Sequence, residues 1–112
     1  KGATVTVLAN VDGKVDLAAM LRDLAAREVN ELHVEAGHKL NGSLLRDGLV
    51  DEWLAYLAPV LLGQGAGWSS LAAPAHLDHA ARWRFLECRP IGDDLLVRMR
   101  GARRDAFLQT NN

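Results

Sequence analysis

The part of the sequence that is richest in possible chemistry is residues 34–43. An apolar segment there ends at an acidic residue, Glu35, and Gly37 and Gly42 bracket the residues that follow. Glycine lets the backbone approach a ligand closely, and the amide N–H groups at the beginning of a helix attract anions. The pattern predicts a strand, a turn and a helix whose first turn could hold a diphosphate. The Glu35 carboxylate could then hydrogen-bond a polar ring or a sugar.

The same glycine spacing leaves a second interpretation open. Gly37-x-x-x-x-Gly42-Ser43 is similar to a phosphate loop, but no lysine stands between the second glycine and the serine. Nucleotide hydrolysis is therefore disfavoured, because that lysine contacts the nucleotide's phosphates. A plain strand-to-helix turn, in which glycine only relieves strain and the glutamate is solvated, would give the same pattern.

The histidines and the single cysteine give weaker evidence of a functional site than residues 34–43 do. His76 and His79 could share one helical face, but no nearby cysteine or glutamate completes a metal site, so no metal is expected. His38 lies inside the glycine turn and is the histidine to test near a ligand, whereas His33 is expected to be packed or on the surface. Cys88 is expected to be a small buried residue.

The sequence shows no set of nucleophile, base and orienting residue, so no catalytic residue is assigned. The three tryptophans are expected to be core or interface anchors: Trp53, Trp68 and Trp83.

The elements that position these residues alternate between strand and helix in the first half of the chain. Strands are predicted over residues 5–8 and 32–34, and helices over residues 17–25 and 40–45. Asp16 is expected to cap the first helix and Gly48 to end the second. Residues 53–58 are apolar on both faces, which is typical of a central parallel strand with right-handed crossover helices. The expected architecture is α/β.

The second half of the chain has a different pattern. Residues 59–75 are rich in glycine and serine and are expected to form a loop. Residues 83–88 and 95–100 alternate as a C-terminal antiparallel hairpin, with Trp83, Phe85 and Glu87 on one face. Residues 102–112 are expected to be a flexible tail.

Bulk composition limits the class of partner. The chain has 112 residues, 49% of them hydrophobic and 24% charged, and a formal net charge of −1, all typical of one globular domain. Because there is no basic surplus, neither nucleic acid nor an anionic membrane surface is an expected partner. One cysteine, no apolar run long enough to span a bilayer and no signal-like start predict a cytoplasmic protein.

An ordered series of short motifs runs from residue 35 to residue 63. The motifs are Glu35-Ala36-Gly37, Leu40-Asn41-Gly42-Ser43-Leu44-Leu45, Gly48-Leu49-Val50-Asp51-Glu52, Ala58-Pro59 and Leu61-Leu62-Gly63. Each motif is weak alone, but the ordered series is specific. Over residues 4–101 the chain therefore resembles the C-terminal part of the reductase domain of the bifunctional riboflavin biosynthesis deaminase and reductase family.

This resemblance implies a dihydrofolate-reductase-like fold, with residues 1–101 as the C-terminal portion of the reductase domain. It also implies NADPH-dependent reduction of the ribosyl group of 5-amino-6-(5-phosphoribosylamino)uracil to a ribityl chain. By position, Glu35 would contact this phosphorylated ribosylaminopyrimidine substrate. The residues that would line the NADPH diphosphate are Gly37, His38, Lys39, Leu40, Asn41, Gly42 and Ser43.

The chain departs from the family pattern at two positions and covers only part of the family's length. His38 and Lys39 stand where the family usually has proline and threonine, so a hydroxyl contact to the cofactor is lost and a positive charge is gained. The deaminase zinc signature and the first half of the reductase domain are not in these residues. This piece is expected to be inactive alone, because half a pocket should orient poorly.

Self-association is also expected, as a homodimer, because the absence of the preceding strands would expose a sheet edge. Two alternatives remain open. One is a non-catalytic assembly module that uses the hairpin and Trp83, and the other is a related reductase with another pyrimidine or a pterin as substrate.

Overall fold

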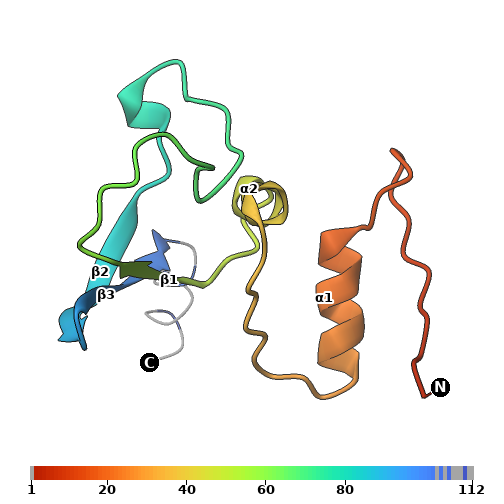
Figure 1. Ribbon diagram of the computed structural model, residues 1–112. Helices are drawn as coiled ribbons and strands as arrows, with labels where there is room; N and C mark the ends of the chain where they lie inside the picture. Colours follow the sequence, from red (N-terminus) through yellow and green to blue (C-terminus); the bar gives the residue numbers. More distant parts are fainter. Residues whose placement is uncertain (1, 103, 105, 107–109, 111–112) are drawn as a thin grey trace. The chain divides into compact units, whose positions relative to one another are not determined.

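The computed structural model describes residues 2–102, 104, 106 and 110 (Figure 1). Its elements, in chain order, are helix α1 (Leu17–Ala26), helix α2 (His38–Arg46), strand β1 (Glu52–Leu57), 3-10 helix η1 (Leu77–His79), strand β2 (Trp83–Ile91) and strand β3 (Asp94–Gly101). The chain forms two compact units, residues 1–36 and residues 37–112. Each unit is described by itself.

Helix α1 of the first unit forms where the sequence predicts it. The Asp16 carboxylate accepts a hydrogen bond of 2.8 Å from the amide of Ala19, which is the expected N-terminal cap. At the other end, the amides of Glu28 and Val29 donate to the carbonyls of Ala25 and Leu24, at 3.0 and 3.1 Å. This is a Schellman ending, and Glu28 takes its left-handed position with a φ of 65°.

The prediction of strands over residues 5–8 and 32–34 is wrong. No ladder forms at either segment, and the described part of the first unit contains one isolated bridge, between Ala9 and Val15. Val5 and Val7 remain 86% and 84% exposed. β-branched residues favour an extended backbone, but a strand also needs a continuous hydrogen-bonded neighbour, and the described residues give residues 5–8 only the backbone hydrogen bond of 2.8 Å from the Asp16 amide to the Leu8 carbonyl.

Helix α2 begins directly after Gly37 and ends with a second Schellman motif. The amides of Gly48 and Leu49 donate to the carbonyls of Leu45 and Leu44, at 3.1 and 2.9 Å. Gly48 has a φ of 66°, so the predicted left-handed glycine at the end of this helix is confirmed.

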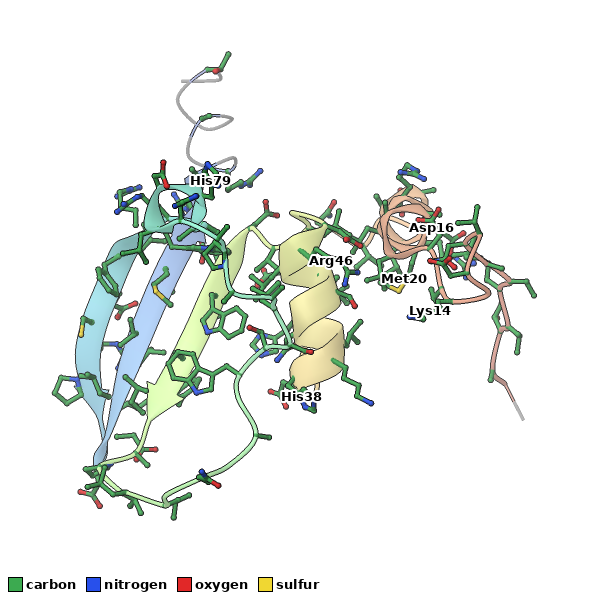
Figure 2. The ribbon with its side chains drawn as sticks, turned by 90° about the horizontal axis from the view of Figure 1, so that it is seen from above. Lys14, Asp16, Met20, His38, Arg46 and His79 are labelled. Atoms are coloured by element: carbon green, nitrogen blue, oxygen red, sulfur yellow. The ribbon has the colours of Figure 1, made fainter. Side chains whose placement is uncertain are left out.

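The sheet of the second unit has the order β1-β3-β2, with both pairings antiparallel. The prediction of a central parallel strand at residues 53–58 is therefore wrong, because β1 pairs with β3 on one side and is an edge strand among the described residues. Its apolar residues are not buried on both faces: Ala55 is 7% exposed, whereas Tyr56 is 59% exposed. Helix α2 lies next to β1 (Figures 1 and 2).

The predicted hairpin of β2 and β3 is confirmed, and Gly92, with a φ of 60°, lies in its turn. The prediction that Trp83, Phe85 and Glu87 share one face of the hairpin is wrong, because the register shifts between Phe85 and Glu87. Leu86 is the extra residue of this bulge, so Glu87 pairs with Arg98 and lies on the opposite face from Phe85. Cys88 consequently shares the face of Phe85 and is exposed, not buried as predicted.

The buried apolar side chains of the second unit come from α2 and the sheet: Leu44, Ala55, Leu96 and Val97. The predicted loop at residues 59–75 is confirmed as irregular backbone. Among the described residues, no helix is both long and apolar enough to cross a membrane.

The tail prediction for residues 102–112 falls mostly outside the described residues. Within that span, Ala102, Arg104, Ala106 and Thr110 have helical backbone, and the Thr110 hydroxyl donates to the Ala106 carbonyl at 2.9 Å. Flexibility of this segment stays a prediction.

Candidate functional site

The first turn of α2 has the features of an anion site. Gly37 caps this helix with extended backbone and no side-chain hydrogen bond, and the first turn carries no acidic residue. The amides that begin a helix have no acceptor inside it, and the backbone dipole gives this end a partial positive charge. The first amide that bonds back is that of Asn41, which donates to the Gly37 carbonyl at 3.2 Å. His38 lies at this end of the helix (Figure 2).

Three further predicted site residues follow along α2. Lys39 and Leu40 are exposed, so the side chain of Lys39 adds a positive charge to the first turn. The Ser43 hydroxyl donates to the Lys39 carbonyl at 3.2 Å, one turn back in the same helix. The hydroxyl hydrogen of Ser43 is therefore donated to the backbone of α2 itself.

Glu35 belongs to the first unit and ends the exposed segment that precedes Gly37. Its side chain is 88% exposed, and its Oε1 atom lies 3.4 Å from Nε2 of His33, which is 60% exposed. The carboxylate is accessible to a ligand, and its predicted contact with the substrate stays a prediction.

Gly42 makes a different close contact from the one predicted. It is buried, and a Cβ atom built on it would lie 2.6 Å from the Ser70 carbonyl oxygen and 2.8 Å from the carbon and the nitrogen of that residue. The space left by the missing side chain is therefore filled by the chain's own backbone. A diphosphate cannot use this space while residues 68–70 occupy it.

Residues 68–70 are attached to α2 by two hydrogen bonds. The Ser70 amide donates to the His38 carbonyl at 2.8 Å, and Nδ2 of Asn41 donates to the Trp68 carbonyl at 3.1 Å. The Trp68 ring in turn stacks on that of Trp53 in β1, with 6.4 Å between ring centroids. Trp53 is half-buried and Trp68 is 58% exposed, so the predicted role of the tryptophans as core or interface anchors stays a prediction.

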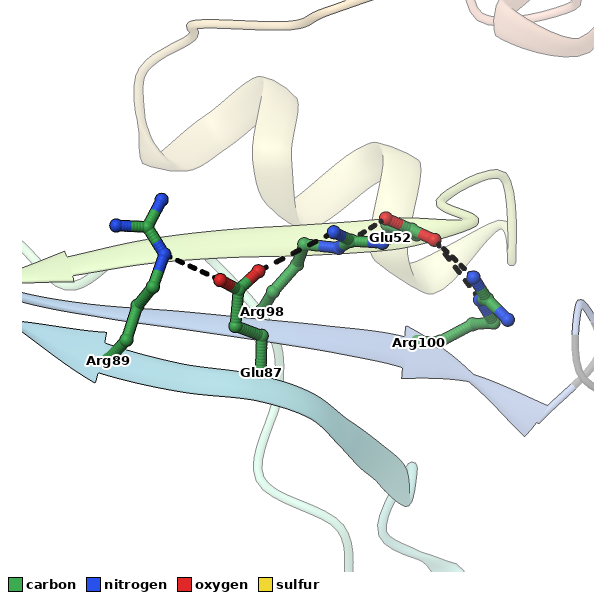
Figure 3. A network of polar contacts seen from close by, with 5 residues as sticks. All are labelled: Glu52, Glu87, Arg89, Arg98 and Arg100. Atoms are coloured by element: carbon green, nitrogen blue, oxygen red, sulfur yellow. Dashed lines mark hydrogen bonds and ion pairs between the residues drawn. The ribbon is translucent and has the colours of Figure 1, made fainter.

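A network of ion pairs that the sequence analysis missed covers one face of the sheet (Figure 3). Glu52 pairs with Arg100 at 2.7 Å and with Arg98 at 3.0 Å, although the Nε atom of Arg98 lacks hydrogen-bond geometry. Glu87 pairs with Arg98 at 3.5 Å and also with Arg89. The signal in the sequence is the pair of arginines two residues apart, which a strand places on one face.

The pKa of Glu52 lies below its ordinary value of 4.5. The hydrogen bond from Arg100 is the main cause; desolvation by burial opposes it, and the charges of Arg98 and Arg100 add to the lowering. Both glutamates of the network are paired with guanidinium groups from neighbouring strands, so the network links β1, β2 and β3.

The histidine pair does not form a metal centre with other residues that the structure describes. The His76 and His79 rings meet edge to face, with 5.7 Å between centroids, at η1. No group of three or more histidine, cysteine, aspartate or glutamate side chains is placed to hold a metal within the described ranges.

Comparison with known proteins identifies similar sequences and structures. The profile of the family described as the RibD C-terminal domain matches residues 1–97. The riboflavin biosynthesis protein RibD of Escherichia coli is 40% identical over 91 residues, which cover 80% of this chain and 25% of that protein. The 5-amino-6-(5-phosphoribosylamino)uracil reductase of Buchnera aphidicola is 28% identical, covering 85% of this chain and 46% of the relative.

A solved structure of Acinetobacter baumannii RibD resembles this chain, with a TM-score of 0.70 and 28% sequence identity. The match covers 77% of this chain and 25% of that protein. The chain therefore spans about a quarter of the length of the RibD proteins that it matches.

Proposed function

Since the chain belongs to the RibD C-terminal domain family, we propose that it forms the cofactor-binding part of an NADPH-dependent reductase in riboflavin biosynthesis. The observation that carries the proposal is the first turn of α2, an anion-attracting helix end without acidic residues, at the position where the family resemblance expects the diphosphate. The name of the Buchnera relative supports the substrate class.

The proposed substrate is 5-amino-6-(5-phosphoribosylamino)uracil, whose ribosyl group becomes a ribityl chain. NADPH, when bound, supplies the hydride for this reduction. The residues of this chain bind and orient the two reactants. Gly37, His38, Lys39 and Leu40 present the first turn of α2 to the diphosphate, and the Glu35 carboxylate accepts a hydrogen bond from the pyrimidine or the sugar.

The charge of Lys39 provides the test of this site. Lys39→Glu places a negative charge at a helix end that otherwise favours anions, so NADPH affinity should fall about tenfold, which corresponds to about 1.4 kcal/mol. Titration of the complete protein with NADPH measures the effect. Lys14→Glu is the matched control, because Lys14 is an exposed lysine in the turn before α1. Equal affinities for the two variants would contradict the proposal.

We also propose that the protein is a homodimer, and a pure assembly role for this chain is the second candidate function. The outer edge of β2 carries Phe85, which is 68% exposed, and the exposed Cys88 on the same face. Trp83 is a less suitable contact than the sequence suggests, because it is half-buried and its ring packs at Gly101.

Sedimentation of a Phe85→Lys variant tests this surface. A charged side chain at a buried apolar contact should convert the dimer to a monomer. Tyr56→Lys is the control, since Tyr56 is 59% exposed and lies on the other face of the sheet. An unchanged dimer in the Phe85→Lys variant would eliminate this surface, and an intact dimer without NADPH binding would favour the assembly role alone.

A further inference from the structure

The contact between residues 68–70 and α2 gives Gly42 a role that differs from ligand contact. We propose that Gly42 is a positioning residue, which lets residues 68–70 dock across α2 so that the docked segment fixes the first turn of the helix for the dinucleotide. This inference rests on the proposed function. Gly42 then controls cofactor affinity without touching the cofactor.

The contact between residues 68–70 and α2 leaves no room for a side chain at position 42. The Ser70 backbone occupies the position of a Gly42 side chain, at distances of 2.6 to 2.8 Å from a Cβ atom built there. Real Cβ atoms do not approach backbone atoms so closely, and the atoms concerned cannot rotate away as the end of a long side chain could. Any larger residue at position 42 must therefore displace residues 68–70 from the helix.

This close approach permits a hydrogen bond between residue 70 and the first turn of α2. The Ser70 amide donates to the His38 carbonyl at 2.8 Å. A trans peptide is planar, with its C=O and N–H pointing in opposite directions, so holding the His38 carbonyl also fixes the direction of the Lys39 amide. That amide is one of those at the beginning of α2 that have no acceptor inside the helix.

Residues 68–70 are also connected to the sheet through Trp68. The Trp68 carbonyl accepts from Asn41 at 3.1 Å, and the Trp68 ring stacks on Trp53 of β1. Residues 68–70 thus link the beginning of α2 to the sheet by contacts at both ends of the segment. A helix end that is held in place before the ligand arrives loses less conformational entropy on binding, which raises affinity.

A glycine-to-alanine pair tests the inference. In Gly42→Ala, exchange of the Ser70 amide hydrogen, followed by NMR, should accelerate at least about tenfold because its hydrogen bond breaks. In the complete protein, the Kd and the KM for NADPH should rise about tenfold, while kcat at saturating NADPH stays within about twofold, as expected when binding alone is weakened. Gly67→Ala is the matched control in the same loop, because its Cβ atom meets only the Ser69 carbonyl oxygen, at an ordinary 3.6 Å. Gly67→Ala should change neither the exchange rate of the Ser70 amide nor the Kd and the KM for NADPH.

The outcomes separate this inference from the proposed function. Faster Ser70 exchange with unchanged NADPH affinity overturns the inference and leaves the cofactor site in place. Failure of the unsubstituted protein to bind NADPH overturns the proposed function, and this inference with it, before any variant is compared. If Gly42→Ala does not fold, Asn41→Ala removes the hydrogen bond to Trp68 and should raise the Kd about threefold. Unchanged affinity in that variant also overturns the inference.

Discussion

Glu52 shows how neighbouring charges set the behaviour of a single residue in this protein. Its pKa is lowered, chiefly by the hydrogen bond from Arg100. The folded protein therefore holds this proton less tightly than the unfolded chain does. The ionised carboxylate contributes stability above its ordinary pKa of 4.5, and this contribution is lost as the pH falls through the lowered pKa of the folded state.

The Glu52→Gln variant should show this pH dependence. At pH 7 its free energy of unfolding in urea should be lower than that of the unsubstituted protein by about 1 kcal/mol, since the ion pairs are partly exposed. The difference should shrink as the pH falls below 4.5 and through the lowered pKa of the folded state, because the carboxylate then becomes protonated in both states. Glu31→Gln, at an exposed glutamate, should change the free energy of unfolding by less than about 0.5 kcal/mol. A Glu52→Gln effect that is constant with pH would contradict the role assigned to the charge.

The sequence could suggest this network only in part. Arg98 and Arg100 are two residues apart, so their common face is predictable from strand geometry. Their partners depend on the pairing of β1 and β2 with β3, and the position of Glu87 depends on the bulge. Neither register nor bulge is encoded in the local pattern of apolar residues, so the partners in this network could not be predicted from the sequence.

At the scale of the elements, the two helices end in the same motif with different residues. The sequence allows the end of α2 to be predicted because Gly48 tolerates the left-handed conformation. The end of α1 gives no such signal, because Glu28 occupies the equivalent position with a φ of 65°. A residue with a Cβ atom is strained there, and the Schellman hydrogen bonds hold it in place.

Glu28→Gly should therefore stabilise the protein, although glycine usually destabilises. We expect a gain of about 0.5 kcal/mol, because relief of the left-handed strain exceeds the entropy that glycine adds to the unfolded chain. Thermal unfolding followed by far-UV circular dichroism measures the change. Glu28→Ala is the control, since it removes the same carboxylate but keeps the strain. An equal effect of both substitutions would show that the lost charge is responsible.

Gly48→Ala should have the opposite effect at the end of α2. Alanine strains the left-handed position, so we expect a loss of about 1 kcal/mol in the free energy of unfolding. Gly48→Asn should cost less, because asparagine adopts this conformation more readily. Urea unfolding of both variants measures the difference, and equal losses would contradict a backbone cause.

At the scale of the whole molecule, sequence patterns predicted helices and the hairpin better than the other strands. Helices α1 and α2 and the hairpin are formed by contacts close in sequence, so caps, periodicity and turn glycines are sufficient to locate them. At residues 5–8 and 32–34 the apolar pattern predicts strands, but no ladder forms at either segment among the described residues. The apolar run of β1 likewise indicates a strand but does not specify that its neighbour is antiparallel.

Amide hydrogen exchange should reproduce this difference along the chain. Residues 5–8 should exchange without measurable protection, because no ladder holds their amides in the described structure. Strand β3 should be the most protected segment, since it pairs on both edges. Strong protection at residues 5–8 in the purified chain would contradict this arrangement and reveal a pairing partner for that segment.

The bulge at Leu86 has a consequence for the evolution of the hairpin. Phe85 pairs with Met99 and Glu87 pairs with Arg98, so Leu86 is the one residue between them without a counterpart on β3. Loss of its codon from the gene would join Phe85 to Glu87 and leave a regular ladder with every other partnership unchanged. Loss of any neighbouring codon that has a counterpart would instead move charged side chains to the wrong surface. Tolerance of a one-codon deletion should therefore be concentrated at this position of β2.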